Sequence, residues 1–190
     1  MLVQTTPPAE EPISLAEARL QLKLTADDPT TEDPLIETYI SAARQYAEAY
    51  TGRSFITQGW RLVLDGFPRC VELEKGVVQT ISAITYRDMA GQWQTLDSSV
   101  YATELSGCPG LVSEAFGQAW PQTLPQIGSV RIDYTAGYGD VASDVPAGIR
   151  NWILLRVETM FEHRGENAAG VVTPLPHVDR MLDPFCVVLA

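Results

Sequence analysis

Hydrophobic positions follow two different periods along the chain, and the changes of period divide it into three parts. Apolar residues recur at helical spacing from Ile13 to Tyr50, alternate with polar residues between Phe55 and Ala136, and return to helical spacing after Pro146. The pattern predicts an α+β protein in which helices from both ends of the chain flank a β region.

Two helix starts are marked by their first residues. Ser14 and Glu17 have the spacing of a capping box, in which the hydroxyl and the carboxylate bind backbone amides that a helix start leaves unpaired. Asp33 followed by Pro34 is typical of an N-cap and first helical residue. We therefore expect a first helix from Ser14 and a long amphipathic helix that ends near Gly52. The apolar stripe of the long helix comprises Ile36, Tyr39, Ile40, Ala43, Tyr46, Ala47 and Tyr50.

The middle of the chain has the alternation of half-buried strands. Alternating residues are Trp60, Leu62 and Leu64, then Val71 and Leu73, and later Val130, Ile132 and Tyr134. Turn-forming residues separate these runs at Gly66-Phe67-Pro68, Ala90-Gly91 and Cys108-Pro109-Gly110. Short strands joined by turns favour antiparallel pairing over crossover units, so we expect a small antiparallel sheet or sandwich.

A final helix is predicted after Pro146, with Gly165 placed to cap its end. Its broad apolar face holds Ile149, Trp152, Ile153, Val157, Met160 and Phe161, which suggests burial against the earlier helices. The segment that follows has no sustained period, yet it is apolar at Leu175, Val178, Met181, Leu182, Phe185, Val187 and Val188. These side chains either pack on their own domain or bind a partner, and the pattern leaves both options open.

The composition is that of a folded acidic protein. The chain has 190 residues, 45% of them hydrophobic, and 13 Lys+Arg against 24 Asp+Glu give a formal charge of −11. Such a charge argues against a broad basic surface that grips phosphate backbones. Residues 1–12, with three prolines and two acids, are expected to form a flexible arm. No apolar run reaches the roughly 18 residues of a membrane span, and no signal peptide is recognised.

Candidate chemistry is sparse. The two histidines, His163 and His177, have no nucleophile motif beside them, so a hydrolase triad is not indicated. The three cysteines form no Cys-x-x-Cys pair, which argues against a zinc site and fits a reducing compartment. We therefore expect no enzymatic activity, no metal and no cofactor.

Two further motifs can be interpreted either as binding sites or as ordinary turns. The acids Asp27, Asp28, Glu32 and Asp33 lack the glycine and the final glutamate of a calcium loop, so a solvated turn is favoured over a metal site. Gly137-Tyr138-Gly139 lacks the third glycine of a dinucleotide-binding loop and is favoured as a turn.

Several stretches in order along the chain resemble the head-tail connector, or adaptor, proteins of tailed bacteriophages and related gene transfer agents. They are Ile13-Ser14-Leu15-Ala16-Glu17-Ala18, Ala47-Glu48-Ala49-Tyr50-Thr51-Gly52-Arg53, Ile81-Ser82-Ala83-Ile84-Thr85-Tyr86, Tyr134-Thr135-Ala136-Gly137-Tyr138-Gly139, Val145-Pro146, Glu162-His163-Arg164 and Asp179-Arg180-Met181-Leu182-Asp183-Pro184-Phe185. The resemblance spans nearly the whole chain, and none of its motifs carries chemistry.

The resemblance implies a structural protein of the virion neck, assembled in the host cytoplasm. It would form a dodecameric ring on the portal protein, extend the channel through which DNA passes without sequence-specific binding, and provide the platform for the stopper protein and the tail. Another neck component, such as a stopper or tail-completion protein, is the alternative. The fold implied is a helical bundle with an inserted antiparallel β domain. Its parts would be an arm (1–12), helices (13–54), the β region (55–136), a C-terminal helix (137–168) and an extended docking tail (169–190).

The same resemblance assigns portal binding to the tail. The residues concerned are Pro174, Leu175, Pro176, Val178, Met181, Leu182 and Phe185. Met181 stands where the family usually has leucine, Phe185 where it has tyrosine, and Cys186 where a basic residue is common.

Overall fold

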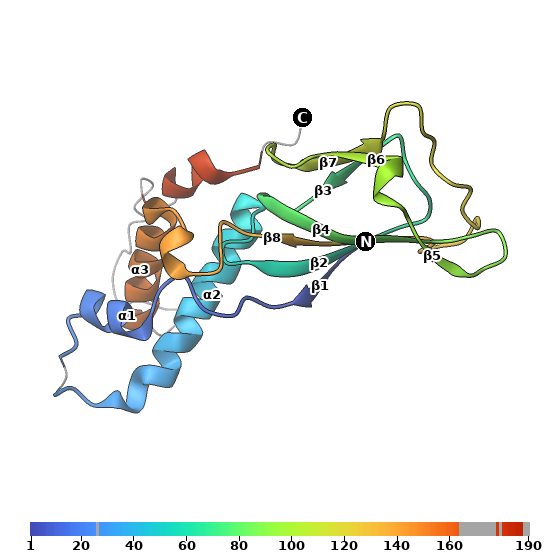
Figure 1. Cartoon of the computed structure of the whole chain (residues 1–190). Helices are drawn as coiled ribbons and strands as arrows, with labels where there is room; N and C mark the ends of the chain where they lie inside the picture. Colours follow the sequence, from blue (N-terminus) through green and yellow to red (C-terminus); the bar gives the residue numbers. More distant parts are fainter. Residues whose placement is uncertain (26, 164–177, 179, 188–190) are drawn as a thin grey trace. The chain divides into compact units, whose positions relative to one another are not determined.

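A computed structural model of the chain (Figure 1) describes residues 1–25, 27–163, 178 and 180–187. The chain divides into two compact units whose segments alternate along the sequence. The sheet unit holds Met1–Ala9, Gly52–Tyr138 and Val187, and the helical unit holds the described residues of Glu10–Thr51 and Gly139–Cys186. Antiparallel sheets and helices in separate units establish the mixed α and β class that the sequence predicts.

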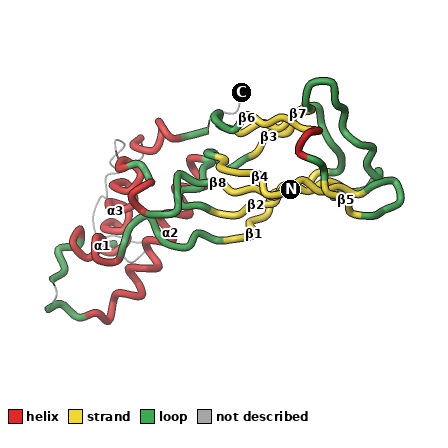
Figure 2. The backbone as a smooth tube through the Cα atoms, in the orientation of Figure 1, coloured by secondary structure: helices red, strands yellow, loops and turns green. Residues whose placement is uncertain are grey.

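Strands and helices separate between the two units (Figure 2). The sheet unit contains β1 (Leu2–Thr6), β2 (Gln58–Leu64), β3 (Cys70–Leu73), β4 (Val78–Arg87), β5 (Trp93–Thr95), the 3-10 turn η2 (Ser98–Val100), β6 (Tyr101–Glu104), β7 (Gly110–Glu114) and β8 (Val130–Ala136). The helical unit contains α1 (Leu15–Gln21), η1 (Thr30–Glu32), α2 (Asp33–Thr51), η3 (Ala142–Asp144), α3 (Ala147–Glu162) and η4 (Arg180–Phe185).

The described strands form two antiparallel sheets. One has five strands in the order β1-β2-β8-β4-β5, and the other has three in the order β3-β7-β6. Strand β8 is central in the larger sheet, with Ile132 opposite both Leu62 of β2 and Ile84 of β4. Strand β8 thus lies between β2 and β4, although both precede it by many residues in the sequence.

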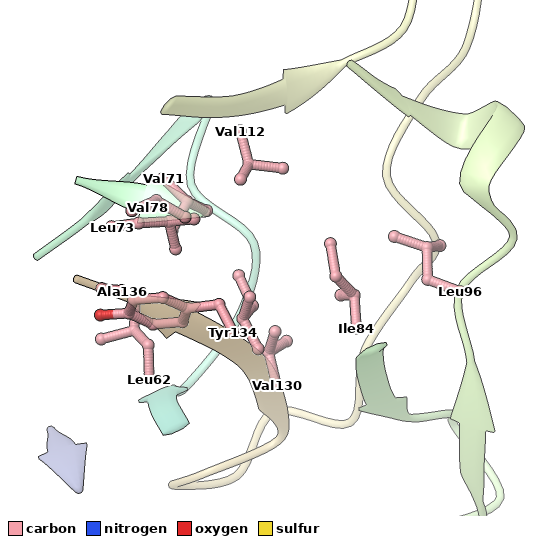
Figure 3. Close-up of a cluster of buried hydrophobic side chains, with 11 residues drawn as sticks. Leu62, Val71, Leu73, Val78, Ile84, Leu96, Val112, Val130, Tyr134 and Ala136 are labelled. Atoms are coloured by element: carbon pink, nitrogen blue, oxygen red, sulfur yellow. The ribbon is translucent and has the colours of Figure 1, made fainter. Parts of the chain in front are cut away.

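The core of the sheet unit lies between the two sheets (Figure 3). Along β8 the side chains of Val130, Ile132, Tyr134 and Ala136 are at most 1% exposed, while the residues between them are half-buried on the opposite face. Val71, Leu73 and Val112 of the smaller sheet pack into the same cluster. Period-two alternation therefore gives this sheet a buried face and an outer face, as the sequence predicts.

Tyr134 brings a hydroxyl into this core without leaving it unpaired. Its Oη donates to the backbone oxygen of Glu74 at 2.9 Å. Burial raises the pKa of Tyr134 far above its ordinary value. The phenol is therefore a neutral hydrogen-bond donor that fixes the β3 segment against β8.

The start of the chain forms an edge strand, so the expectation of a flexible arm is wrong for Leu2–Thr6. These residues pair antiparallel with β2, with Leu2 opposite Leu62 and Gln4 opposite Trp60. The Gln4 side chain also donates to Oε1 of Gln58 at 2.7 Å. The prolines that suggested an arm follow the strand, whereas the strand itself gains a partner for its backbone amides.

The capping box at the start of α1 is confirmed. The backbone amide of Ser14 donates to Oε2 of Glu17 at 2.9 Å, and the amide of Glu17 donates to Oγ of Ser14 at 3.2 Å. Arg150 of α3 also pairs with the Glu17 carboxylate, so one side chain both caps α1 and joins it to α3.

Glu17→Gln is expected to weaken the chain in a pH-dependent manner. The hydrogen bond from the Ser14 amide lowers the pKa of Glu17, and Arg150 acts in the same direction. A carboxyl with a lowered pKa contributes stability above its unfolded pKa and loses that contribution as the pH falls through its folded pKa. The variant should be less stable by about 0.5–1 kcal/mol at pH 7, and this deficit should shrink below about pH 4. Thermal melts at neutral and acid pH measure it, and a deficit of constant size at both would contradict the assignment.

Helix α2 packs against α3, but its buried stripe is rotated from the one the sequence predicts. Its buried residues are Ile36, Ile40, Ala43, Arg44, Ala47, Glu48 and Thr51. Tyr46 and Tyr50 are 53% and 48% exposed. Tyr46 nevertheless stacks on Trp152 of α3, with ring centroids 5.8 Å apart and planes at 8°. The tyrosines border the helix contact and do not fill it, because each has a hydroxyl that water can reach.

Candidate docking site in the C-terminal segment

The described part of the C-terminal segment, residues 178 and 180–187, contains the short helix η4, which packs on α2 and α3 within the helical unit. Leu182 is its anchor, at 1% exposure. Val178, Met181 and Phe185 are half-buried. Three of the residues assigned to portal docking, Pro174, Leu175 and Pro176, lie outside the described residues. The four that are described gather on one segment of the helical unit.

Polar contacts hold η4 against α2. The hydroxyl of Tyr50 donates to Oδ1 of Asp183 at 2.8 Å. This hydrogen bond, together with the negative charge of Asp183, raises the pKa of Tyr50. The thiol of Cys186 lies 3.8 Å from the backbone oxygen of Tyr50. The end of α2 therefore serves as the support for η4.

Phe185 lies against the first turn of α3. A Cβ placed on Gly148 would come within 3.3 Å of Cε2 of the Phe185 ring. A Cβ at this position would require the ring to shift by a few tenths of an ångström, so the ring packs closely on the backbone of α3. One side of the ring is covered in this way, and the residue as a whole is half-buried.

The expectation of an extended tail is wrong for residues 180–185. They form the 3-10 helix η4, in which Leu182 and Phe185, three residues apart, lie on one face. The sequence leaves open whether these side chains pack locally or bind a partner. Leu182 packs on its own unit, whereas Met181 and Phe185 keep part of their surface accessible to a partner.

Charge differs strongly between the two units. The segments of the helical unit contain 16 acidic and 7 basic residues, a formal charge of −9, whereas those of the sheet unit contain 8 and 6, a charge of −2. The helix η4, the candidate docking segment, therefore belongs to the acidic part of the molecule. Phosphate backbones are repelled by such a surface.

The other candidate motifs have structural roles in the described residues. Asp28 accepts from the amide and the hydroxyl of Thr25, at 2.5 and 2.9 Å. Asp33 pairs with Arg19. Gly137 is a turn residue with φ +152°. No group of three or more potential metal ligands occurs among the residues that the structure describes.

His163 ends α3 and is exposed, while His177 falls outside the described residues. Within the described ranges, no helix is long and apolar enough to cross a membrane.

Solved structures with the same fold cover the whole chain. A chain from "Neck of empty GTA particle computed with C6 symmetry" aligns with a TM-score of 0.82 and 27% identity, over 100% of this chain and 97% of that one. A chain from "Virion of native gene transfer agent (GTA) particle" gives 0.81 and 25%, with the same coverage. A third, from "Neck of native GTA particle computed with C12 symmetry", gives 0.78 and 24%, also over 100% and 97%.

No match was found among curated proteins. A family model described as "Phage gp6-like head-tail connector protein" matches residues 12–106. This match includes the capped helix α1, the long helix α2 and the strands β2 to β6. The chain therefore belongs to the phage gp6-like head-tail connector protein family.

Proposed function

We propose that this chain is a structural protein of a virion neck, in which copies form a ring of twelve that joins the head to the tail. The observation that carries the proposal is the similarity over the full chain to a protein from the neck of a gene transfer agent particle, with a TM-score of 0.82. Membership of the connector family supports the same role and favours an adaptor over a stopper or tail-completion protein. The C6 symmetry of that neck is compatible with twelve copies.

In this role the partner on the head side is the portal protein, and the docking segment is η4. Three apolar side chains of this segment are half-buried: Val178, which precedes η4, and Met181 and Phe185 within it. Between the last two, Leu182 is fully buried and anchors the segment. Apolar side chains that keep part of their surface in solvent gain free energy when a partner covers them. The anchor Leu182 holds the segment in place before the partner arrives, which lowers the entropic cost of docking.

The acidic charge has a role in the same assembly. DNA that passes through a ring must slide without being retained, and each Lys or Arg contact to phosphate would add salt-dependent attraction. A chain with a charge of −11 keeps such contacts few. The stopper protein, on the tail side of the ring, would meet a surface other than η4.

The double variant Met181→Ser/Phe185→Ser is expected to bind the portal protein at least about tenfold more weakly, because two apolar contacts of an interface are lost. Val157→Ala is the matched control: Val157 is buried in α3, so the substitution costs about 1–3 kcal/mol of stability without changing η4. Portal binding by both variants is measured with purified full-length chain at a temperature where both are folded. A double variant that binds within twofold of the wild type, or a control that loses as much binding, would exclude η4 as the docking segment.

A further inference from the structure

The outer face of the five-stranded sheet has an unusual composition for so acidic a chain. We define the outer face by Arg61 of β2, Arg87 of β4, Trp93 of β5, and Arg131 and Asp133 of β8, which the strand register brings onto neighbouring strands. Three of the chain's 13 basic residues therefore lie together. The one acidic residue in this set is Asp133. Its two carboxylate oxygens accept from Nε and Nη2 of Arg61 at 2.6 and 3.0 Å.

The other two arginines lie over an aromatic ring. The guanidinium carbon of Arg131 is 4.1 Å from the centroid of the Trp93 ring, and that of Arg87 is 5.0 Å away. Neither forms a salt bridge within the described residues. Trp93 itself is 37% exposed. The cluster presents two positive charges and the surface of an indole to solvent, and cation–π contact holds the guanidinium groups in place.

Exposed apolar side chains surround this cluster. Met1 is 77% exposed, Val3 40% and Ile127 88%. They line a shallow depression of about 340 Å³ together with Arg61, Arg87 and Arg131. Arginine, tryptophan and methionine beside exposed aliphatic groups are the residue types enriched in protein–protein interfaces. The combination indicates a protein surface with acidic and apolar groups as the occupant.

The neighbouring carboxylates are engaged in turns. Asp88 accepts from the amides of Ala90 and Gln92, both at 2.9 Å, in the turn between β4 and β5. Asp65 accepts from the amide of Gly128 at 2.9 Å. Both lie beyond the strands of the outer face, so they do not pair with its arginines.

We propose that the outer face binds the acidic helical unit of the next copy of this chain in the ring. The proposal rests on the proposed function, which requires copies to associate head to tail around an axis. The chain itself supplies the complementary charge: the segments of its helical unit carry −9. One hollow of that unit places the exposed Glu10 and Glu37 beside the half-buried Leu15, while Glu11 in the same hollow is paired with Arg44.

A second copy fits the outer face better than duplex DNA does. DNA binding at physiological salt relies on many phosphate contacts, whereas this face has two arginines without a carboxylate partner. Its exposed Met1, Val3 and Ile127 have no counterpart on a phosphate backbone. In a heterologous contact, by contrast, one basic and one acidic surface per chain are sufficient to close a ring.

The test is the self-association of the full-length chain, measured by native mass spectrometry and sedimentation up to about millimolar concentration, the range of weak interfaces. Wild-type chain should associate in a concentration-dependent manner, and added salt should weaken the association. Arg87→Glu/Arg131→Glu should weaken it at least about tenfold. Arg69→Glu, a charge reversal at an exposed residue outside the outer face, should leave it within about twofold of the wild type, as rim charges do.

A second arm tests the acidic side of the contact. Glu37→Lys alone should also weaken self-association, and a mixture of Glu37→Lys chains with Arg87→Glu/Arg131→Glu chains should give heterodimers, because each variant keeps the surface that the other lacks. Heterodimers without larger rings are the signature of a head-to-tail contact.

Four results would overturn the proposal. They are a wild-type chain that stays monomeric at about millimolar concentration, self-association that Arg87→Glu/Arg131→Glu leaves unchanged, equal loss in Arg69→Glu, and duplex DNA binding that the double variant abolishes while self-association persists. Portal binding, measured separately, distinguishes this outcome from failure of the proposed function. A chain that binds portal normally but fails these tests disproves the contact between copies and leaves the adaptor role intact.

Discussion

Replacing Arg44 by alanine is expected to lower the free energy of unfolding by about 3–5 kcal/mol. Arg44 is 7% exposed on the buried stripe of α2. Its guanidinium donates to both oxygens of Glu11, at 2.7 and 3.1 Å, and to Oε2 of Glu48 at 2.8 Å. Burial acts to lower the pKa of Arg44, but the two carboxylates outweigh it and raise the pKa above its ordinary value. Alanine removes the cation that faces both the largely buried carboxylate of Glu48 and the partly exposed carboxylate of Glu11.

The matched control for this prediction is Glu11→Gln/Arg44→Met/Glu48→Leu, which replaces the buried pair by apolar side chains of similar length and removes the charge of the third member. Such replacements are close to neutral, because the desolvation cost of both charges is also removed. Urea denaturation of the three proteins gives the comparison. An alanine variant that loses less than about 1 kcal/mol, the value of an exposed ion pair, would show that the network is solvated.

Gly137→Ala is expected to destabilise the chain by about 3 kcal/mol or more. Gly137 follows β8 with φ +152°, a conformation that residues with a Cβ rarely adopt. A Cβ at this position would lie 2.7 Å from the backbone nitrogen of Thr57 and 2.8 Å from the carbonyl of Ile56. Both are backbone atoms, so no side-chain rotation relieves the clash.

Gly91→Ala separates the two causes. Gly91 has φ +80°, but nothing lies within 4 Å of the position a Cβ would take. The substitution should therefore cost only the conformational strain, about 1 kcal/mol. Thermal or urea unfolding measures both variants, and equal losses would show that the crowding at Gly137 is relieved by backbone movement.

Features with local causes can be predicted from the sequence. The capping box of Ser14 and Glu17 needs only residues three positions apart, and it is present with both hydrogen bonds. The strand β8 is predictable because its alternation is continuous over Val130, Ile132 and Tyr134. The predictions for α2 and α3 also rest on short-range periodicity, and both helices are present.

Features that depend on distant partners cannot be predicted in the same way. A short polar segment such as Leu2–Thr6 becomes a strand because β2 offers an unpaired edge more than 50 residues away. Arg44 and Glu48 lie outside the apolar stripe that the sequence predicts for α2, since charged residues are rarely buried unless paired. The second carboxylate partner of Arg44, Glu11, lies before the first helix. The i, i+4 spacing of Arg44 and Glu48 is the available signal.

The candidate interface on the sheet is likewise hidden in the sequence. Arg87, Trp93 and Arg131 come from three strands, and only the pairing of β4 with both β5 and β8 brings them together. The docking segment is partly visible, because the apolar residues from Val178 to Phe185 stand out against their surroundings. Whether they pack locally depends on the shape of α2 and α3, which the sequence pattern does not give.

Particles made without this chain show whether it is the adaptor of a virion neck. Particles are purified from cells in which the gene for the chain is deleted, with and without a plasmid copy, and imaged by electron cryomicroscopy. If the chain is the adaptor, the deletion gives heads without attached tails, and restoring the chain gives tailed particles with a ring of density at the head–tail junction. Complete tailed particles formed in its absence, with the junction unchanged, would show that the chain is not the adaptor.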